Sequence, residues 1–240
     1  HFIEHLIFKG TEKVKANEMA SRIESLGGVV NAYTSYDNTV YHIIVPSRAF
    51  EEGFELLVDA VRNPAFPEEE IEKERKVVLE EIKMGEDDPQ RKLFKELFST
   101  SYREHPYGRP IIGYEDTVKS INRDEILNYF KKYYVPDNMA IVIAGDFDPK
   151  TADVLIKKHF YEKSIQSKTT GIDNINKNSF ETDEDGKDSK KKSDVNENII
   201  ERNVKESYLA IAYRIPSIVD KDTPALEVLG TILGEGESSR

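Results

Sequence analysis

The sequence contains no cysteine. Disulfides are therefore excluded, which fits a reducing compartment but also fits a secreted protein that needs none. No apolar run approaches the roughly 20 residues that a helix needs to cross a bilayer, so no membrane span is predicted in this segment. Basic residues are fewer than acidic ones, with 34 Lys and Arg against 45 Asp and Glu. The resulting formal net charge of −11 argues against nonspecific binding to nucleic acid or an anionic membrane. An acidic interior could instead favour basic peptides.

Apolar residues are sufficient for a folded core, since 38% of the 240 residues are hydrophobic. This amount allows one large or two modest domains. Periodicity and turn signals predict helices over residues 17–26, 47–62, 67–84, 122–134, 149–160 and 223–233, another helix around 93–98, and strands over 29–35, 39–45, 139–144 and 204–215. This mixture favours an α+β fold. Residues 164–198 are rich in Asn, Asp, Lys and Ser, and we expect a disordered insertion there because little apolar surface can be buried.

The first five residues read His-Phe-Ile-Glu-His. On an α-helix each residue advances about 100°, so His1, Glu4 and His5 project from one face while the apolar residues occupy the other. Two neutral imidazoles on one face can bind one metal ion, and zinc accepts such ligands well. A catalytic zinc site usually has three protein ligands and one open position, so a third ligand is expected from elsewhere in the chain.

The best source of that ligand is the acidic helix predicted over residues 67–84, which is expected to end near Gly85. Glu74 and Glu81 lie about two turns apart on its apolar face, whereas Glu80 is rotated by about 100°. A bound cation would compensate a carboxylate on that face. We therefore predict Glu81 as the third ligand and Glu74 as a supporting carboxylate behind the ligands. The alternative is that both are ordinary solvated residues of an acidic helix.

These residues resemble the pitrilysin/insulinase family of zinc peptidases, the inverzincins, whose motif has the order H-x-x-E-H. In that family a metal-binding glutamate follows the second histidine by about 76 residues and another glutamate precedes it by seven. Here Glu81 follows His5 by 76 residues and Glu74 by seven. The resemblance covers almost the whole chain, with further similar segments at residues 31–41, 105–113, 134–146 and 234–240.

The expected function is zinc-dependent hydrolysis of peptide bonds in oligopeptides or unfolded segments. Glu4 lies between the ligands and would act as the general base that activates a water molecule, a role that direct coordination of Zn²⁺ would prevent. The resemblance implies the same roles. His42, His105 and His159 are expected to be structural or solvent-exposed and are assigned no chemistry. The alternative function is a non-catalytic scaffold or partner subunit of the same fold.

Residues 29–35 and 39–45 read as a β-hairpin, and an exposed strand edge can bind an extended peptide substrate through main-chain hydrogen bonds. The resembling family uses this strand, which makes Asn31 and Ala32 the predicted substrate contacts. An ordinary sheet strand is the alternative.

The resemblance further implies a mainly antiparallel sheet covered by helices, a metalloenzyme half-domain of the pitrilysin/processing-peptidase type. Residues 1–115 would form the zinc-binding region and 116–240 a second peptidase-family region. Because the first residue is a predicted ligand, we expect a fragment of a two-half enzyme, in which a second homologous half or subunit closes around the peptide. A bacterial-type peptidase is expected before a processing-peptidase-like subunit, and a cytoplasmic location before the mitochondrial matrix or periplasm.

Overall fold

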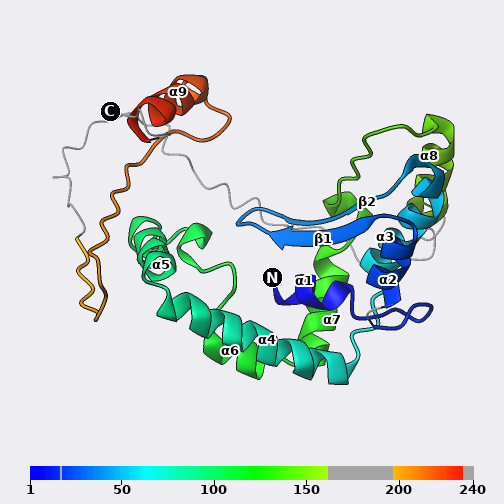
Figure 1. The fold of residues 1–240 in the computed structure, drawn as a ribbon, viewed down its shortest axis with the longest axis horizontal. Coiled ribbons are helices and arrows are strands. Elements are labelled where there is room, and N and C mark those ends of the chain that lie inside the picture. The colour runs from blue at the N-terminus through cyan, green and yellow to red at the C-terminus, as the bar shows by residue number, and fades with distance from the viewer. Residues whose placement is uncertain (17, 162–196, 235–240) are drawn as a thin grey trace.

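The computed structural model describes residues 1–16, 18–161 and 197–234 of the protein (Figure 1). A two-stranded antiparallel sheet lies among helices, most of them α-helical, with three short 3₁₀ turns and one π-helical turn. In chain order the elements are α1 (Phe2–Ile7), α2 (Glu18–Ser25), β1 (Val29–Thr34), β2 (Thr39–Ile44), η1 (Ser47–Ala49), α3 (Phe50–Arg62), α4 (Glu68–Asp87), α5 (Pro89–Ser101), η2 (Pro106–Gly108), α6 (Glu115–Ser120), α7 (Arg123–Tyr133), η3 (Pro136–Asn138), α8 (Pro149–Ile156), η4 (Lys157–Tyr161) and α9 (Thr223–Gly234).

The α+β class predicted from the sequence is confirmed, with helices dominating the described residues. In Figure 1, α4 runs along one side of the molecule, α1 lies between it and the hairpin of β1 and β2, and α6 lies against the other face of α4. The main core joins buried side chains of these elements, including Leu6 and Ile7 from α1, Val78 from α4 and Ile126 from α7. The first helix is therefore held between the sheet and α4.

The hairpin forms where the sequence predicts it. Asn31 is paired with His42 and Ala32 with Tyr41 in the antiparallel register. Gly27 directly follows the helix predicted over residues 17–26 and has a φ of +81°, a conformation that glycine adopts without strain. The prediction that α2 stops here is confirmed, because α2 ends at Ser25.

The start of α4 depends on a strained turn. Phe66 has a φ of +46° and is fully buried, a left-handed conformation that costs a bulky residue on the order of 1–3 kcal/mol. Arg123 stabilises the turn from α7, because its Nε donates to the carbonyl oxygen of Phe66 at 2.8 Å and its Nη2 to that of Ala65 at 3.0 Å. The ring of Phe66 also packs edge-on against Phe130, with centroids 5.3 Å apart. These contacts set the direction in which α4 leaves the core.

The long helix has Gly85 near its end as predicted, but it runs three residues beyond the predicted bound at residue 84, because α4 continues to Asp87. A glycine inside a helix costs about 1 kcal/mol relative to alanine but does not terminate it. The helix ends instead at Asp88, whose backbone is extended and whose side chain accepts from the N–H groups of Gln90 and Arg91 at the start of α5. Pro89 enforces this break, since a residue before proline is disfavoured in the α conformation.

Two predicted strands, residues 139–144 and 204–215, are not strands in the structure. Both are mostly exposed; Val142, for example, is 89% exposed. A strand is stable only with a neighbour that takes up its backbone hydrogen bonds, and in the described part of the chain β1 and β2 pair only with each other. The apolar character of the two segments does not by itself supply such a neighbour.

Nearly all of the insertion predicted over residues 164–198 lies outside the described residues. Within the ranges that are described, no helix has both the length and the apolar character that crossing a membrane requires.

Candidate metal centre

Helix α1 presents the predicted motif as the sequence suggests. Phe2 and Ile3, together with Leu6 and Ile7 in the next turn, are buried. His1 is the N-cap residue, and its carbonyl oxygen accepts the backbone N–H of His5 at 3.2 Å. Burial of the apolar side of α1 against the core leaves His1, Glu4 and His5 on the side that is not fully buried.

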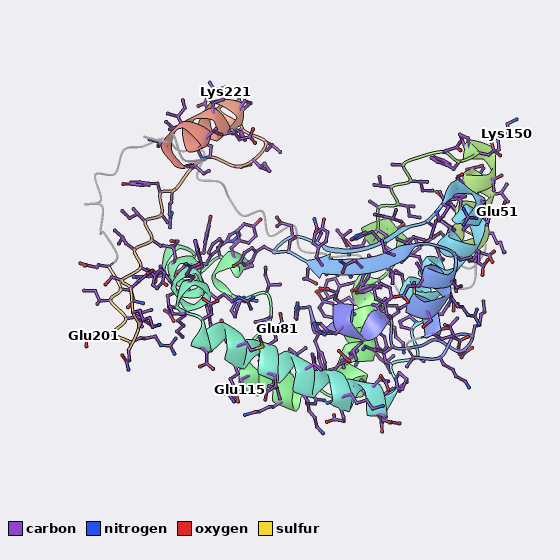
Figure 2. The ribbon with its side chains drawn as sticks, viewed as in Figure 1. Glu51, Glu81, Glu115, Lys150, Glu201 and Lys221 are labelled. Carbon is purple, nitrogen blue, oxygen red and sulfur yellow. The ribbon has the colours of Figure 1, made fainter. Side chains whose placement is uncertain are left out.

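Glu81 of α4 lies opposite the two histidines. Its Oε2 is 3.8 Å from His1 Nε2 and 3.7 Å from His5 Nε2. One candidate ligand atom from each residue gives a set in which all atoms lie within 4.8 Å of one another. Figure 2 shows Glu81 on the face of α4 that is turned toward α1 and the hairpin, with Glu115 of α6 on the other side of α4. No second group of this kind occurs in residues 1–16, 18–161 and 197–234.

This set fits zinc. Bonds of about 2.0–2.1 Å in a tetrahedral arrangement place neighbouring ligand atoms roughly 3.3 Å apart. The two contacts of Glu81 with the histidines would shorten by about 0.5 Å, and the widest spacing in the set, which is within 4.8 Å, by up to about 1.5 Å. Two imidazoles and one carboxylate are also a ligand set that catalytic zinc uses. His1 Nδ1 is buried and has no hydrogen-bond partner among the described residues. The ring is therefore oriented by packing and by the contact of its Nε2 with Glu81.

Glu74 contacts His5 from behind. Its Oε2 is 3.1 Å from His5 Nδ1, and the residue is only 8% exposed. An ionised carboxylate only accepts hydrogen bonds, so Nδ1 is the donor in this contact. In the neutral ring this tautomer has its lone pair on Nε2, the nitrogen that faces Glu81. This is the geometry expected of a supporting carboxylate that selects the tautomer of a metal-ligating histidine.

Lys9 was missed by the sequence reasoning. Its Nζ is 2.6 Å from Glu74 Oε1. One oxygen of Glu74 therefore contacts His5, and the other contacts the ammonium group of Lys9. Burying a carboxylate is unfavourable unless it is paired, and Lys9 supplies that pairing. The sequence shows only that a lysine follows His5 by four residues, about one helical turn. No local pattern connects this lysine to Glu74, which lies on another helix.

We predict that Lys9→Met destabilises the site through Glu74. The free energy of unfolding should fall by about 1–3 kcal/mol, because a carboxylate loses its charged partner, and zinc affinity should fall about tenfold, as for other outer-shell changes. Chemical denaturation and a zinc titration measure the two effects. Lys13→Met is the matched control: its side chain is 74% exposed and its nitrogen lies 3.6 Å from Asp59, so little change is expected. Equal behaviour of the two variants would contradict the role of Lys9.

Glu4 is outside the group of candidate ligands. Its Oε2 accepts a short hydrogen bond from the hydroxyl of Thr34 at the end of β1, a contact that the sequence reasoning did not predict. Thr34 therefore fixes the orientation of this carboxylate relative to the sheet. Since Glu4 shares the face of α1 that carries the two histidines, it lies beside the candidate metal position without joining the ligand set.

A pair of tyrosines lies near Glu4. The hydroxyl groups of Tyr41 and Tyr134 are 2.7 Å apart, and the bond joins β2 to the end of α7. Burial raises the pKa of the Tyr41 phenol far above its usual range, and the neighbouring Tyr134 and the charge of Glu4 raise it further. Burial also raises the pKa of Tyr134. Both phenols therefore stay protonated at neutral pH, and the pair joins β2 to the end of α7 without carrying charge.

Asn31 and Ala32 lie on β1, which is the strand nearer to α1 (Figure 1). Among the described residues β1 has a paired neighbour only in β2, so its other edge is available along the side of the metal-ligand group. The backbone N–H of Ala32 donates to Asn31 Oδ1 at 2.8 Å, which is a local contact that an incoming backbone carbonyl could replace.

The other three histidines do not join the group. His42 lies within β2, His105 Nδ1 accepts from the backbone N–H of Tyr107 at 3.2 Å, and His159 Nε2 is 3.6 Å from Glu55. The expectation that they are not ligands agrees with this placement.

Comparison with known proteins identifies the class. Residues 1–115 match the family model described as Insulinase (Peptidase family M16), and residues 120–240 match the model described as Peptidase M16 inactive domain. The chain belongs to peptidase family M16, the insulinase family, and the resemblance to the pitrilysin/insulinase family is confirmed.

Several curated relatives carry peptidase names. A protein of Bacillus subtilis named "Uncharacterized zinc protease" is 34% identical over 241 residues, which cover 100% of this chain and 54% of that protein. A protein of the same description from Mycobacterium leprae is 31% identical, covering 100% of this chain and 52% of the relative. A "Probable mitochondrial-processing peptidase subunit beta" of Arabidopsis thaliana is 31% identical, over 98% of this chain and 42% of that protein. The chain thus spans about half the length of such relatives.

Solved structures share the fold. A protease from Helicobacter pylori superposes with a TM-score of 0.74 at 27% identity, over 100% of this chain and 56% of that one. The first half of the periplasmic protease PqqL from Escherichia coli gives a TM-score of 0.58 at 29% identity, over 66% of this chain and 36% of that one. The half-domain architecture expected from the sequence is therefore confirmed. The family to which the chain belongs includes relatives named zinc proteases.

Proposed function

We propose that this chain carries the metal site of a zinc metalloendopeptidase, with His1, His5 and Glu81 as the ligands of Zn²⁺. The observation that supports this most directly is the meeting of two imidazole nitrogens and one carboxylate oxygen within 4.8 Å, from elements far apart in the sequence. Bound there, zinc would lower the pKa of a water molecule to about 7 and polarise the scissile carbonyl.

Glu4 would transfer the proton of the water molecule, and Glu74 would support the ligand His5. Glu4 would accept the proton of the attacking water and return it to the leaving amine, so that one carboxylate serves first as base and then as acid. The hydroxyl of Thr34 holds one oxygen of Glu4, which keeps the base in one orientation through both transfers. Glu74 holds His5 in the tautomer that leaves Nε2 available for the metal.

The substrate would be an extended peptide added to the edge of β1. Asn31 and Ala32 would contact its backbone, and main-chain hydrogen bonds would give affinity with limited dependence on side chains. We further propose that a second homologous half or subunit closes over the peptide, since relatives of this family are about twice as long as this chain. The regional boundary near residue 116 and a cytoplasmic location stay predictions.

The test is the zinc content and chelator sensitivity of the intact gene product. We expect about one zinc per metal site by elemental mass spectrometry, hydrolysis of unstructured peptides, and loss of hydrolysis on chelation that returns when zinc is added. A folded protein that binds no zinc after the metal has been supplied would contradict the proposal and favour the scaffold alternative.

A further inference from the structure

Four hydroxyl groups form a row that begins at the carboxylate of Glu4. Thr34 donates to Glu4 Oε2, and its hydroxyl oxygen is 3.4 Å from that of Thr39. The side chain of Thr39 also contacts the phenol of Tyr134, whose oxygen is 2.7 Å from that of Tyr41. The hydroxyl row therefore leads from the proposed base, across the end of the hairpin, to the end of α7.

The register of the hairpin brings the members of the row from β1 and β2 to one face of the sheet. Thr34 is paired with Thr39, and directly paired residues of antiparallel strands point to the same face. Thr39 and Tyr41 are two residues apart on β2, so they share that face as well. It is the face toward α1, because Thr34 contacts Glu4 and the ring of Tyr41 packs edge-on against Phe8, with centroids 5.7 Å apart.

The charge of Glu4 gives the hydroxyl row a direction. A hydroxyl group has one proton to donate, and an ionised carboxylate can only accept. Because Thr34 donates its proton to Glu4, Thr39 is the donor in the bond between the two threonines. The oxygen of Thr39 can then accept the proton of Tyr134, whose oxygen accepts that of Tyr41. Every proton of the row thus points toward the carboxylate, and bonds aligned in this way polarise one another.

The far end of the hydroxyl row is fixed by packing. The ring of Tyr134 stacks on Phe130 with centroids 4.6 Å apart, and Phe130 packs against Phe66 in the main core. Burial raises the pKa of both phenols, and the negative charge of Glu4 contributes to the rise in each. The two phenols therefore sense the carboxylate from a position that the core holds in place.

We propose that Thr39 and Tyr134 are positioning residues for the proposed base, and that they act through the hydroxyl of Thr34 to hold Glu4 in the orientation that accepts the proton of the water molecule. With Oε2 held by Thr34, Oε1 of Glu4 is left for that proton. The inference rests on the proposed function and adds two residues outside the metal-ligand group. Tyr134 lies beyond residue 116, so the region predicted to be separate from the zinc-binding one takes part in orienting the base.

The kinetic test removes one hydroxyl at a time from the intact gene product. Tyr134→Phe and Thr39→Val should each lower kcat about 3- to 10-fold, the contribution of one neutral hydrogen bond, with KM and zinc content unchanged. Thr39→Ser keeps the hydroxyl and should keep the parental kcat. The matched control is Tyr133→Phe, which should also keep it, because this neighbouring tyrosine is 40% exposed and its ring packs on Tyr129. Parental kcat in Tyr134→Phe and Thr39→Val would overturn the inference.

A double-mutant cycle distinguishes positioning from a structural role. Thr34→Val should lower kcat by itself, and adding Tyr134→Phe to it should lower kcat no further, because the effect of Tyr134 passes through Thr34. Two independent losses that multiply would mean that Tyr134 only stabilises the fold, and the inference would fall.

A spectroscopic test needs neither zinc nor hydrolysis. In zinc-free protein with an NMR-active carbon at the tyrosine Cζ, the resonance of Tyr134 should shift when Glu4→Gln removes the charge at the end of the row. This response should fall by about half or more when Thr39→Val interrupts the row. A response that persists in full would mean that the charge acts through space, which overturns the chain of bonds. A protein that shows the interrupted response but no hydrolysis would overturn the proposed peptidase and leave the hydroxyl row standing, whereas hydrolysis without that response would do the reverse.

Discussion

Glu81→Ala should leave the intact gene product folded but nearly free of zinc. Two histidines would remain, and with the carboxylate removed no third protein ligand lies among the described residues. Changes behind the ligands already reduce metal affinity about 10- to 100-fold, so loss of a ligand should reduce it by more than about 100-fold. Elemental mass spectrometry after dialysis and competition with a zinc indicator measure this, and peptide hydrolysis should fall with it.

Glu80→Ala is the matched control for this variant. The residue neighbours Glu81 on α4, but it is exposed and turned away from the histidines. The two variants remove the same charge from the same helix, so circular dichroism and denaturation should not distinguish them by more than about 0.5 kcal/mol. Zinc retained in Glu81→Ala, or lost equally in Glu80→Ala, would show that Glu81 is not a ligand.

Glu4→Gln should separate metal binding from hydrolysis. The side chain keeps its shape, and its carbonyl oxygen can still accept the hydrogen bond from Thr34, but it cannot take up a proton. Zinc content should stay at the parental level while kcat falls about 10²- to 10⁴-fold, the usual contribution of a general base. Single-turnover kinetics on a fluorogenic peptide, with zinc measured on the same sample, give both quantities.

The control for Glu4→Gln is Glu24→Gln, which changes an exposed glutamate of α2 and should leave kcat unchanged. If Glu4→Gln hydrolyses peptide at the parental rate, Glu4 is not the base. If it loses zinc instead, its role lies in the ligand set, and the assignment of Glu81 would have to be reconsidered.

Local rules predicted most of the helices because each depends on residues close in sequence. The capping pattern of Asn122 with Glu125, for instance, begins α7 within one residue of the predicted start. The same rules placed the end of α4 three residues early, because the break belongs to Asp88 and Pro89 and not to Gly85. They failed for residues 139–144 and 204–215, since strand pairing depends on a partner that a local pattern does not contain.

The sequence by itself determined the chemistry that this chain can present: two histidines and a glutamate on one helical face, and a second helix with Glu74 and Glu81 two turns apart. Helical periodicity is a local property, so these groupings follow from spacing alone. The tertiary structure decided which atoms meet, because His5 and Glu74 are separated by 69 residues and are joined only by packing of α1 on α4. For the same reason it alone placed Lys9 behind Glu74 and the hydroxyl of Thr34 on Glu4.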